Sequence, residues 1–422
     1  MEIPLSPNSV LQYLGGSKKS ERYFLFALAG IQFTHILDFM IMMPLGPQFI
    51  SAFQINTHQF GLLISSYTFA AAIAGVFATY YIDRFERRKL LLTLYIAFTL
   101  ATLACGLATS YETLFLARAL AGVFGGTLGS LVQTIVADTI PFERRGKAIG
   151  TVMAAFSVST VAGVPLSLFL ANHISFLGWR APFIFIALLA SAIFWLGYQF
   201  IPSIAGHLAH KADGNRFRQI YRLVIQRDHL IAFGFMALIM LTGFSVIPYI
   251  ALYFTMNVGV PDAYISLVYL FGGIASLLSS RYIGSLADRY GKERTFRALA
   301  ILSLVPIIVT TNLVPVPIWL VLINSTAFFI LVSGRMIPAM AMVSQVIEPK
   351  NRGTFMSLIG SVQMLGSGIA SVIAGMVITI SPSGQIEHYN RVGYGAVLCG
   401  LLTFWLVGKI KPYRAPAHQT PG

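Results

Sequence analysis

Residues 284–292 read GSLADRYGK and follow a long apolar run, and residues 83–89 read DRFERRK and follow another. Each stretch precedes an Arg-Gly pair, at residues 352–353 and at residues 145–146 respectively. The aspartate and the arginine are 64 residues apart in the later copy and 62 residues apart in the earlier one. Two such pairs in the same order indicate that the second half of the chain repeats the first. The stretches therefore predict a chain built from two related halves.

The composition is that of a membrane protein. Of the 422 residues, 56% are hydrophobic and 10% are charged, whereas soluble domains carry roughly 25% charged residues. A bilayer core about 30 Å thick needs about 20 mainly apolar residues per helical span. Runs of this kind are longer than the alternating strands of a membrane barrel. The sequence predicts twelve spans, at residues 23–45, 58–82, 90–108, 113–138, 147–171, 181–202, 229–256, 263–285, 297–313, 317–346, 354–379 and 392–409.

The basic residues indicate the orientation of the chain in the bilayer. The formal net charge is +14, and 25 of the 29 Lys and Arg residues fall on one side if the N-terminus is cytoplasmic. Because cytoplasmic loops carry an excess of Lys and Arg, we expect both termini in the cytoplasm of a bacterium and the protein in its inner membrane. We expect no nucleic-acid partner, since topology accounts for the charge. Residues 1–22 lack the pattern of a cleaved signal peptide.

The longest polar interruption divides the chain into two parts. We predict an N-terminal six-helix bundle at residues 1–202, a cytoplasmic linker at residues 203–228, and a C-terminal six-helix bundle with a short tail at residues 229–422. The expected fold is an all-α membrane protein with two pseudo-symmetric bundles. Cys105 and Cys399 lie in spans of opposite halves, which argues against a disulfide or a metal pair.

The repeated stretches resemble the signature G-x-x-x-D-R-x-G-R-R of the major facilitator superfamily. The later copy keeps Gly284, Asp288, Arg289 and Gly291; the earlier copy keeps Asp83, Arg84, Arg87 and Arg88 but has Thr79 and Glu86 where glycines are expected. Residues 118–122 (RALAG) and 162–165 (AGVP) resemble segments of twelve-span drug:proton and arabinose-efflux-permease-like antiporters. The resemblance extends from Tyr23 to Trp405.

The resemblance implies that the repeated stretches are gates. Asp83 is expected at the N-terminus of span 11 and Asp288 at that of span 5, where the helix dipole favours an anion. These contacts would latch the cytoplasmic ends together in the outward-facing state. The alternative for Arg84, Arg87 and Arg88 is that they set the topology alone. The candidate gating residues are Asp83, Arg84, Arg87, Arg88, Gly284, Asp288, Arg289 and Gly291. Gly122, Gly163 and Pro165 are expected to serve close helix packing; the alternative for Pro165, and for Pro338, is that the proline bends its helix.

Asp38 is the acidic residue nearest the middle of any predicted span. It lies about 22 Å along span 1 from the cytoplasmic side, and Arg118 lies about 9 Å into span 4 from the other side, so the two reach a similar depth. We predict an ion pair that faces the central cavity and loads or releases a proton, because burial disfavours the carboxylate and a guanidinium favours it. The alternative is a static pair that fixes helix packing. His35, one turn before Asp38, is either a proton relay or a neutral hydrogen-bond partner.

Arg335 is the charged residue nearest the middle of any span in the second half. It would bind an anionic or polar group of a substrate or pair with a backbone carbonyl. Weaker candidates for lining a substrate site share polar or polarisable side chains on helices that border the cavity of this fold: Gln133, Thr242, Tyr249, Tyr253, Asn324, Gln363 and Met364. The 32 Phe and 14 Met residues are compatible with an adaptable apolar pocket.

These features favour a secondary transporter that exports a small organic compound in exchange for protons by alternating access. Such a protein would need no cofactor besides the proton gradient and would act as a monomer. The main alternative is proton-coupled uptake in the same fold. An intramembrane enzyme is disfavoured because the sequence has no phosphate-binding loop, no H-E-x-x-H helix and no G-x-S-x-G turn. A non-transporting receptor would not need two latches and a buried ion pair.

Overall fold

The computed structural model describes residues 18–205, 221, 223–348 and 351–413. Within them, twelve helical segments are long and apolar enough to cross a membrane, and they coincide with the twelve predicted spans. The helices of the first half are α2 (Lys18–Ile41), α3 (Gly46–Phe53), α4 (Thr57–Tyr81), α5 (Arg87–Gly106), α6 (Tyr111–Thr139), α7 (Phe142–Val158), α8 (Val164–His173) and α9 (Arg180–Phe200). Those of the second half are α11 (Arg227–Phe244), α12 (Ile250–Tyr253), α13 (Asp262–Tyr290), α14 (Lys292–Thr311), α15 (Ile318–Gly334), α16 (Met336–Val343), α17 (Arg352–Val377) and α18 (Tyr389–Leu406).

Three spans are interrupted; the sequence analysis named bends at Pro165 and Pro338 in two of these spans, but not the interruptions themselves. A π-helical turn, Ser159–Gly163, joins α7 to α8 within one span. A 3-10 turn, Ile247–Tyr249, separates α11 from α12, and its Pro248 has no N–H to continue the helix. The tenth span is divided at Arg335, between α15 and α16. The first span ends at Ile41 rather than at residue 45, because a turn follows and leads into the short helix α3.

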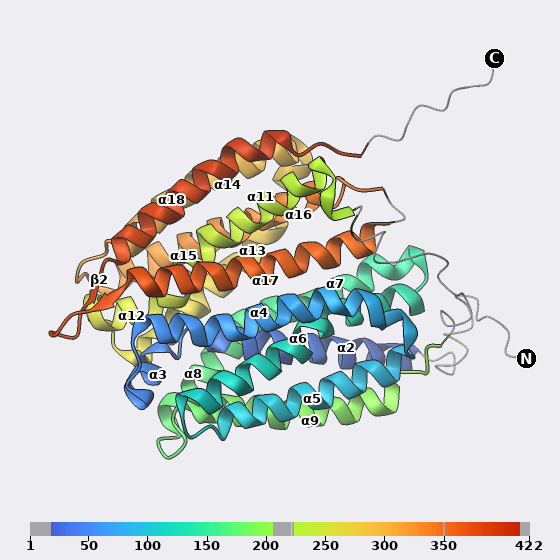
Figure 1. The fold of residues 1–422 in the computed structure, drawn as a ribbon, viewed down its shortest axis with the longest axis horizontal. Helices are drawn as coiled ribbons and strands as arrows, with labels where there is room; N and C mark the ends of the chain where they lie inside the picture. The colour runs from blue at the N-terminus through green and yellow to red at the C-terminus, as the bar shows by residue number, and fades with distance from the viewer. Residues whose placement is uncertain (1–17, 206–220, 222, 349–350, 414–422) are drawn as a thin grey trace, which may run out of the picture.

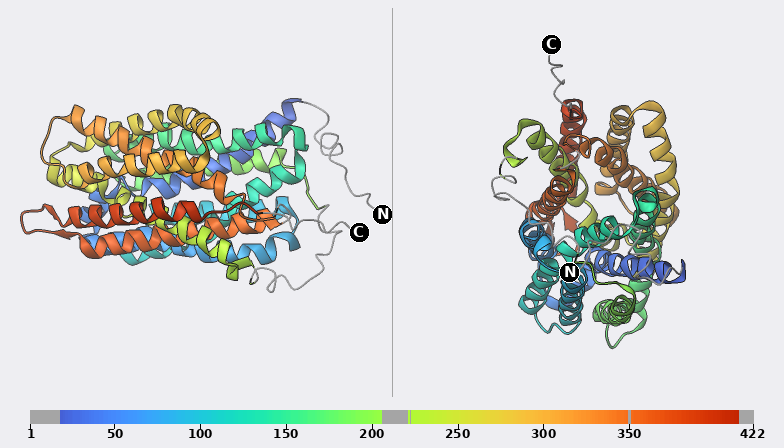
Figure 2. Two further views of the ribbon diagram at one scale, coloured as in Figure 1. Left: turned by 90° about the horizontal axis from the view of Figure 1, so that it is seen from above. Right: turned by 90° about the vertical axis from the view of Figure 1, so that its right-hand side faces the viewer.

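The helices of each half lie together, and the halves meet along their length (Figures 1 and 2). At the boundary α4 runs beside α17, and α13 packs against α8 and the π-helical turn (Figure 1). Where α13 meets that turn, a Cβ on Gly273 would lie 3.1 Å from the carbonyl carbon of Thr160, which is a tight contact with the backbone of the turn. The linker residues 206–220 and 222 lie outside the described part, and the domain bounds stay a prediction.

The two ends of the bundle differ in how the halves meet. A two-stranded hairpin, β1 (Thr379–Ile380) and β2 (Ile386–Glu387), marks one end, which we call the hairpin end. The other, the terminal end, is where α2 begins and α18 ends (Figure 1). At the hairpin end a single cluster of buried apolar residues draws members from both halves. Towards the terminal end the buried residues form two separate clusters, one in each half.

Hydrogen bonds cross between the halves at the hairpin end. The Tyr249 hydroxyl lies 2.9 Å from the carbonyl oxygen of Ser371 on α17 and 3.3 Å from that of Thr57 on α4, placed to donate to them. The Thr57 hydroxyl in turn donates to the carbonyl of Gly375 on α17. The halves are therefore joined by buried contacts at the hairpin end, whereas their buried clusters towards the terminal end are separate.

Candidate functional site

Asp38 and Arg118 form an ion pair inside the first half. Arg118 Nη1 donates to Asp38 Oδ2 at 2.6 Å, from α6 to α2. Both residues are 0% exposed. The predicted pairing is therefore present, but the pair does not face an open cavity in this structure, because neighbouring helices enclose it on all sides. Its part in proton coupling stays a prediction.

Two further side chains, which the sequence analysis missed, complete the ion-pair site. Thr102 of α5 donates through Oγ1 to Asp38 Oδ1 at 3.2 Å. The Tyr67 ring of α4 lies 4.6 Å from the Arg118 guanidinium carbon, a distance at which the ring face attracts a cation. Each carboxylate oxygen thus has a donor, and the guanidinium has both an anion and an aromatic face. Nothing in the sequence marks Thr102 or Tyr67 among the many hydroxyl and aromatic residues of these spans.

Glycines let α6 approach α4 closely enough for this contact. A Cβ on Gly122 would lie 2.3 Å from the carbonyl oxygen of Tyr67, and one on Gly125 would lie 2.4 Å from the Tyr67 hydroxyl. Real Cβ atoms do not approach other atoms so closely, so a side chain at either position would push Tyr67 away from Arg118. Gly163 is crowded by side-chain ends rather than by backbone, with Leu37 Cδ1 2.8 Å from the place of its Cβ.

His35 and Gln32 form a second polar group on α2. His35 Nε2 and Gln32 Oε1 are buried atoms with no hydrogen-bond partner. Both side chains lie beside Gly129 of α6, where a Cβ would be 3.4 Å from His35 Nε2 and 3.8 Å from Gln32 Nε2. No hydrogen bond or ion pair joins His35 to Asp38 among the described residues, so its proposed relay role rests on its position alone.

Arg335 is a fully buried cation in the second half, at 0% exposure. Its one hydrogen bond within the described residues runs from Nη2 to the carbonyl oxygen of Ile239 at 3.4 Å, which is long. Nε and Nη1 have no partner. Of the two alternatives predicted for Arg335 from the sequence, the contact with a backbone carbonyl is present. It uses one N–H donor of the guanidinium and leaves those of Nε and Nη1 without an acceptor.

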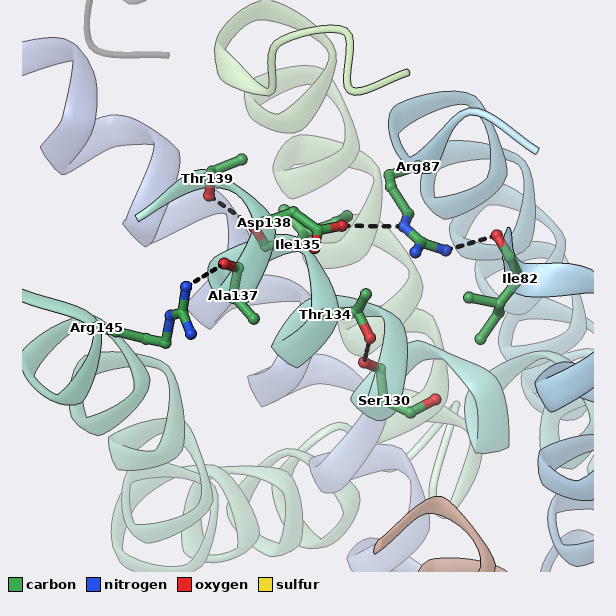
Figure 3. Close-up of polar contacts among 9 residues, drawn as sticks. All are labelled: Ile82, Arg87, Ser130, Thr134, Ile135, Ala137, Asp138, Thr139 and Arg145. Carbon is green, nitrogen blue, oxygen red and sulfur yellow. Dashed lines mark hydrogen bonds and ion pairs between the residues drawn. The ribbon is translucent and has the colours of Figure 1, made fainter. Parts of the chain in front are cut away.

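The first repeated stretch contacts the terminal end of α6. Arg87 donates through Nε to Asp138 Oδ2 at 3.2 Å and through Nη1 to the carbonyl oxygen of Ile82 at 2.6 Å (Figure 3). Arg145, at the start of the next span, donates to the carbonyl oxygen of Ala137 at 2.7 Å (Figure 3). The sequence analysis missed Asp138, although an acidic residue at the end of a span, six residues before the basic pair Arg144 and Arg145, is visible in the sequence.

Glu86 replaces a glycine of the signature and has its own partners. It accepts a hydrogen bond from Ser203 Oγ at 2.6 Å and pairs with Lys89 at 3.4 Å. Burial raises the pKa of Glu86, but the hydrogen bonds from Ser203 and Lys89 outweigh that effect and leave the pKa below its ordinary value. Its φ is −57°, whereas Gly291 at the matching place has φ +93°. The two loops therefore turn differently, and only the second one requires glycine.

The second repeated stretch has few contacts in this structure. Asp288 is exposed and makes no hydrogen bond or ion pair within the described part of the chain. Arg84 and Arg289 are also exposed, and Arg88 donates to the carbonyl oxygen of Tyr198 at 2.6 Å. The side chain of Asp83 lies outside the described residues. The latch contacts predicted for an outward-facing state are therefore not seen for Asp288, and they stay a prediction.

The weaker candidates for a substrate site do not converge on one place. The Tyr249 hydroxyl donates across the boundary between the halves to the carbonyl oxygen of Thr57, and the Tyr253 hydroxyl donates to that of Leu313. Thr242 donates to a carbonyl of its own helix, and Asn324 donates to Thr310 Oγ1 at 2.8 Å. Gln133 is exposed, while Gln363 and Met364 are partly buried. The described residues contain no group of three His, Cys, Asp or Glu side chains that could hold a metal ion.

Comparisons with known proteins identify a family. The model of the Major Facilitator Superfamily matches residues 28–277 and residues 229–421. Multidrug resistance protein 2 of Bacillus subtilis (strain 168) is 23% identical over 401 residues, which cover 93% of this chain and 97% of that protein. A probable sugar efflux transporter of Pasteurella multocida (strain Pm70) is 28% identical over 274 residues, 64% of this chain and 65% of that protein. Among solved structures, a D-xylose-proton symporter has a TM-score of 0.74 at 18% identity and covers 94% of this chain and 99% of that chain.

Proposed function

Because the chain belongs to the Major Facilitator Superfamily, and is thus a multi-pass membrane transporter of small molecules, we propose that it exports small organic compounds in exchange for protons. The observation that supports proton coupling is the enclosed pair of Asp38 and Arg118. Placing an ionisable pair in the hydrocarbon region of a bilayer costs free energy, so the presence of such a pair indicates a function. Export is supported by the names of two relatives, a multidrug resistance protein and a sugar efflux transporter.

The proposed cycle uses exchange of partners within this site. In the closed pair, Asp38 is held as a carboxylate by Arg118 and Thr102. A proton that reaches Asp38 from outside the cell neutralises it and releases Arg118, which keeps the face of Tyr67 as a second partner. Reopening to the cytoplasm restores the pair and expels the proton. The repeated loops at the terminal end, with Asp83 and Asp288, are proposed to latch the cytoplasmic side when the opposite side opens.

A transport assay tests the proposal. A growth screen of an efflux-deficient bacterial host against antibiotics, sugars and metabolites supplies a cargo, and the purified protein is then reconstituted in liposomes with an imposed pH gradient. We expect the gradient to drive cargo accumulation in wild type and in Glu387→Gln, an exposed carboxylate on β2, but not in Asp38→Asn. Gradient-driven transport by Asp38→Asn at the wild-type rate would show that Asp38 is not the proton-coupling site. Accumulation in the opposite direction would indicate uptake.

A further inference from the structure

Arg335 carries a charge that the described part of the second half does not neutralise. No ion pair involves it, Nε and Nη1 have no hydrogen-bond partner, and Nη2 reaches only one carbonyl oxygen at 3.4 Å. The acidic residues of that half, Asp228, Asp262, Asp288, Glu293, Glu348 and Glu387, all lie at or beyond helix ends. A buried cation without a counter-charge is costly unless a partner arrives. An anion from outside the chain would supply that partner.

The position of Arg335 fits a ligand site rather than a packing role. The tenth span is divided at this residue, and discontinuous helices border the binding sites of many transporters. On the α11 side the guanidinium faces Gly243, where a Cβ would still be 3.9 Å from Nη2. The adjacent Phe244 packs against Phe39 of α2, with ring centroids 5.9 Å apart. Arg335 therefore lies one helix away from the boundary between the halves.

This boundary also connects Arg335 to the proton site. The Phe39 ring lies 5.5 Å from the Tyr67 ring, which in turn covers Arg118. Phe39 follows Asp38 directly in the chain. A molecule bound at Arg335 and reaching towards Phe244 would consequently touch the aromatic residues that border the ion pair.

We propose that Arg335 binds the anionic group of the transported compound and that the cargo is a small organic anion with an apolar body. A carboxylate offers two acceptor oxygens to the unpartnered guanidinium N–H groups, and such charge-assisted bonds are the strongest of their kind. Phe244 and Phe39 supply the apolar contact for the body. The inference rests on the proposed export function, but it concerns binding, which needs no proton gradient.

The test is a binding measurement on the full-length protein purified in detergent, without a pH gradient. The probes are benzoate, salicylate and 1-naphthoate, each paired with its neutral amide, and the readouts are Tm and a titrated Kd. We expect at least one carboxylate to raise the Tm saturably while its amide does not. Arg335→Gln should weaken binding at least about 30-fold, and Arg335→Lys should keep part of it. Arg391→Gln, an exposed arginine at the hairpin end, is the matched control.

Three results would overturn the assignment: no carboxylate stabilises the wild type, amides bind as tightly as acids, or Arg335→Gln binds as wild type does. Folding of the variants is checked by a second measurement, the Tm without any anion. Because Arg335 is an unpaired buried charge in the protein without an anion, Arg335→Met should have a higher Tm than wild type; a lower Tm would assign Arg335 to packing instead. Asp38→Asn should still bind the carboxylate, so failure of proton coupling is distinguishable from failure of this site.

Discussion

Two arginines are fully buried among the described residues, and their surroundings are opposite. Arg118 in the first half has a carboxylate at 2.6 Å and an aromatic face at 4.6 Å. Arg335 in the second half has one carbonyl oxygen at 3.4 Å. The halves share a fold and a repeated loop, yet among the described residues Arg118 is neutralised by a carboxylate and Arg335 is not. In the function proposed above, the difference separates two tasks: a proton acts on the internal pair, whereas the unpaired cation binds a ligand.

The largest expected effect comes from removing the cation of the paired site. Arg118→Met leaves Asp38 buried without its counter-charge, and breaking a buried pair in this way costs about 3–5 kcal/mol. Unfolding of the purified protein in detergent measures the loss. The double variant Asp38→Asn/Arg118→Met should recover most of it, because no lone charge remains. If Arg118→Met is no less stable than Arg335→Met, the contrast between the two arginines is wrong.

The architecture could be predicted from the sequence because the bilayer sets the length and the apolar character of each span. Twelve runs of about 20 apolar residues leave little choice of element, and the repeat of residues 83–89 at residues 284–292 supplied the division into halves. The interruptions at Ser159–Gly163 and at Arg335 were not predictable in the same way. They depend on how neighbouring helices pack, which apolar runs do not encode.

The site was predictable where a charge stands alone in apolar sequence. Asp38, Arg118 and Arg335 were found for that reason, and the depth of the first two along their helices predicted their pairing. Thr102 and Tyr67 were missed because hydroxyl and aromatic residues are common in these spans and only the packing of α4, α5 and α6 selects them. The enclosure of the pair was also missed, since sequence spacing gives depth in the membrane but not exposure to a cavity.

A substitution at Gly243 would give the unpaired Arg335 a carboxylate partner within the protein. A Cβ on Gly243 would make only ordinary contacts, at 3.5 Å from Val332 and 3.9 Å from Arg335 Nη2. Gly243→Asp should therefore pair with Arg335 and be more stable than Gly243→Asn by about 2 kcal/mol, while losing carboxylate binding. Thermal unfolding of both variants measures the difference. The advantage of Asp over Asn should vanish in the Arg335→Gln background; if it persists there, Arg335 is not the partner.

The aromatic contact of the paired site should have a smaller effect. Tyr67→Leu removes the ring face from Arg118 and should cost about 2 kcal/mol, the size of a desolvated cation–π contact. Tyr67→Phe keeps the face and should stay close to wild type, because no hydrogen bond of the Tyr67 hydroxyl is part of the site. The measurement is again unfolding in detergent. Equal losses for Leu and Phe would assign the effect to the hydroxyl group rather than to the ring.

The smallest effect is expected at Thr102, which is hydrogen-bonded to Asp38 of the ion pair. Thr102 donates to Asp38 Oδ1 over 3.2 Å, which is long for a bond to a carboxylate. Thr102→Val keeps the shape and should cost about 1 kcal/mol, whereas Thr102→Ser keeps the donor and should cost less. Equal losses for Val and Ser would assign the effect to packing at this position rather than to the hydrogen bond with Asp38.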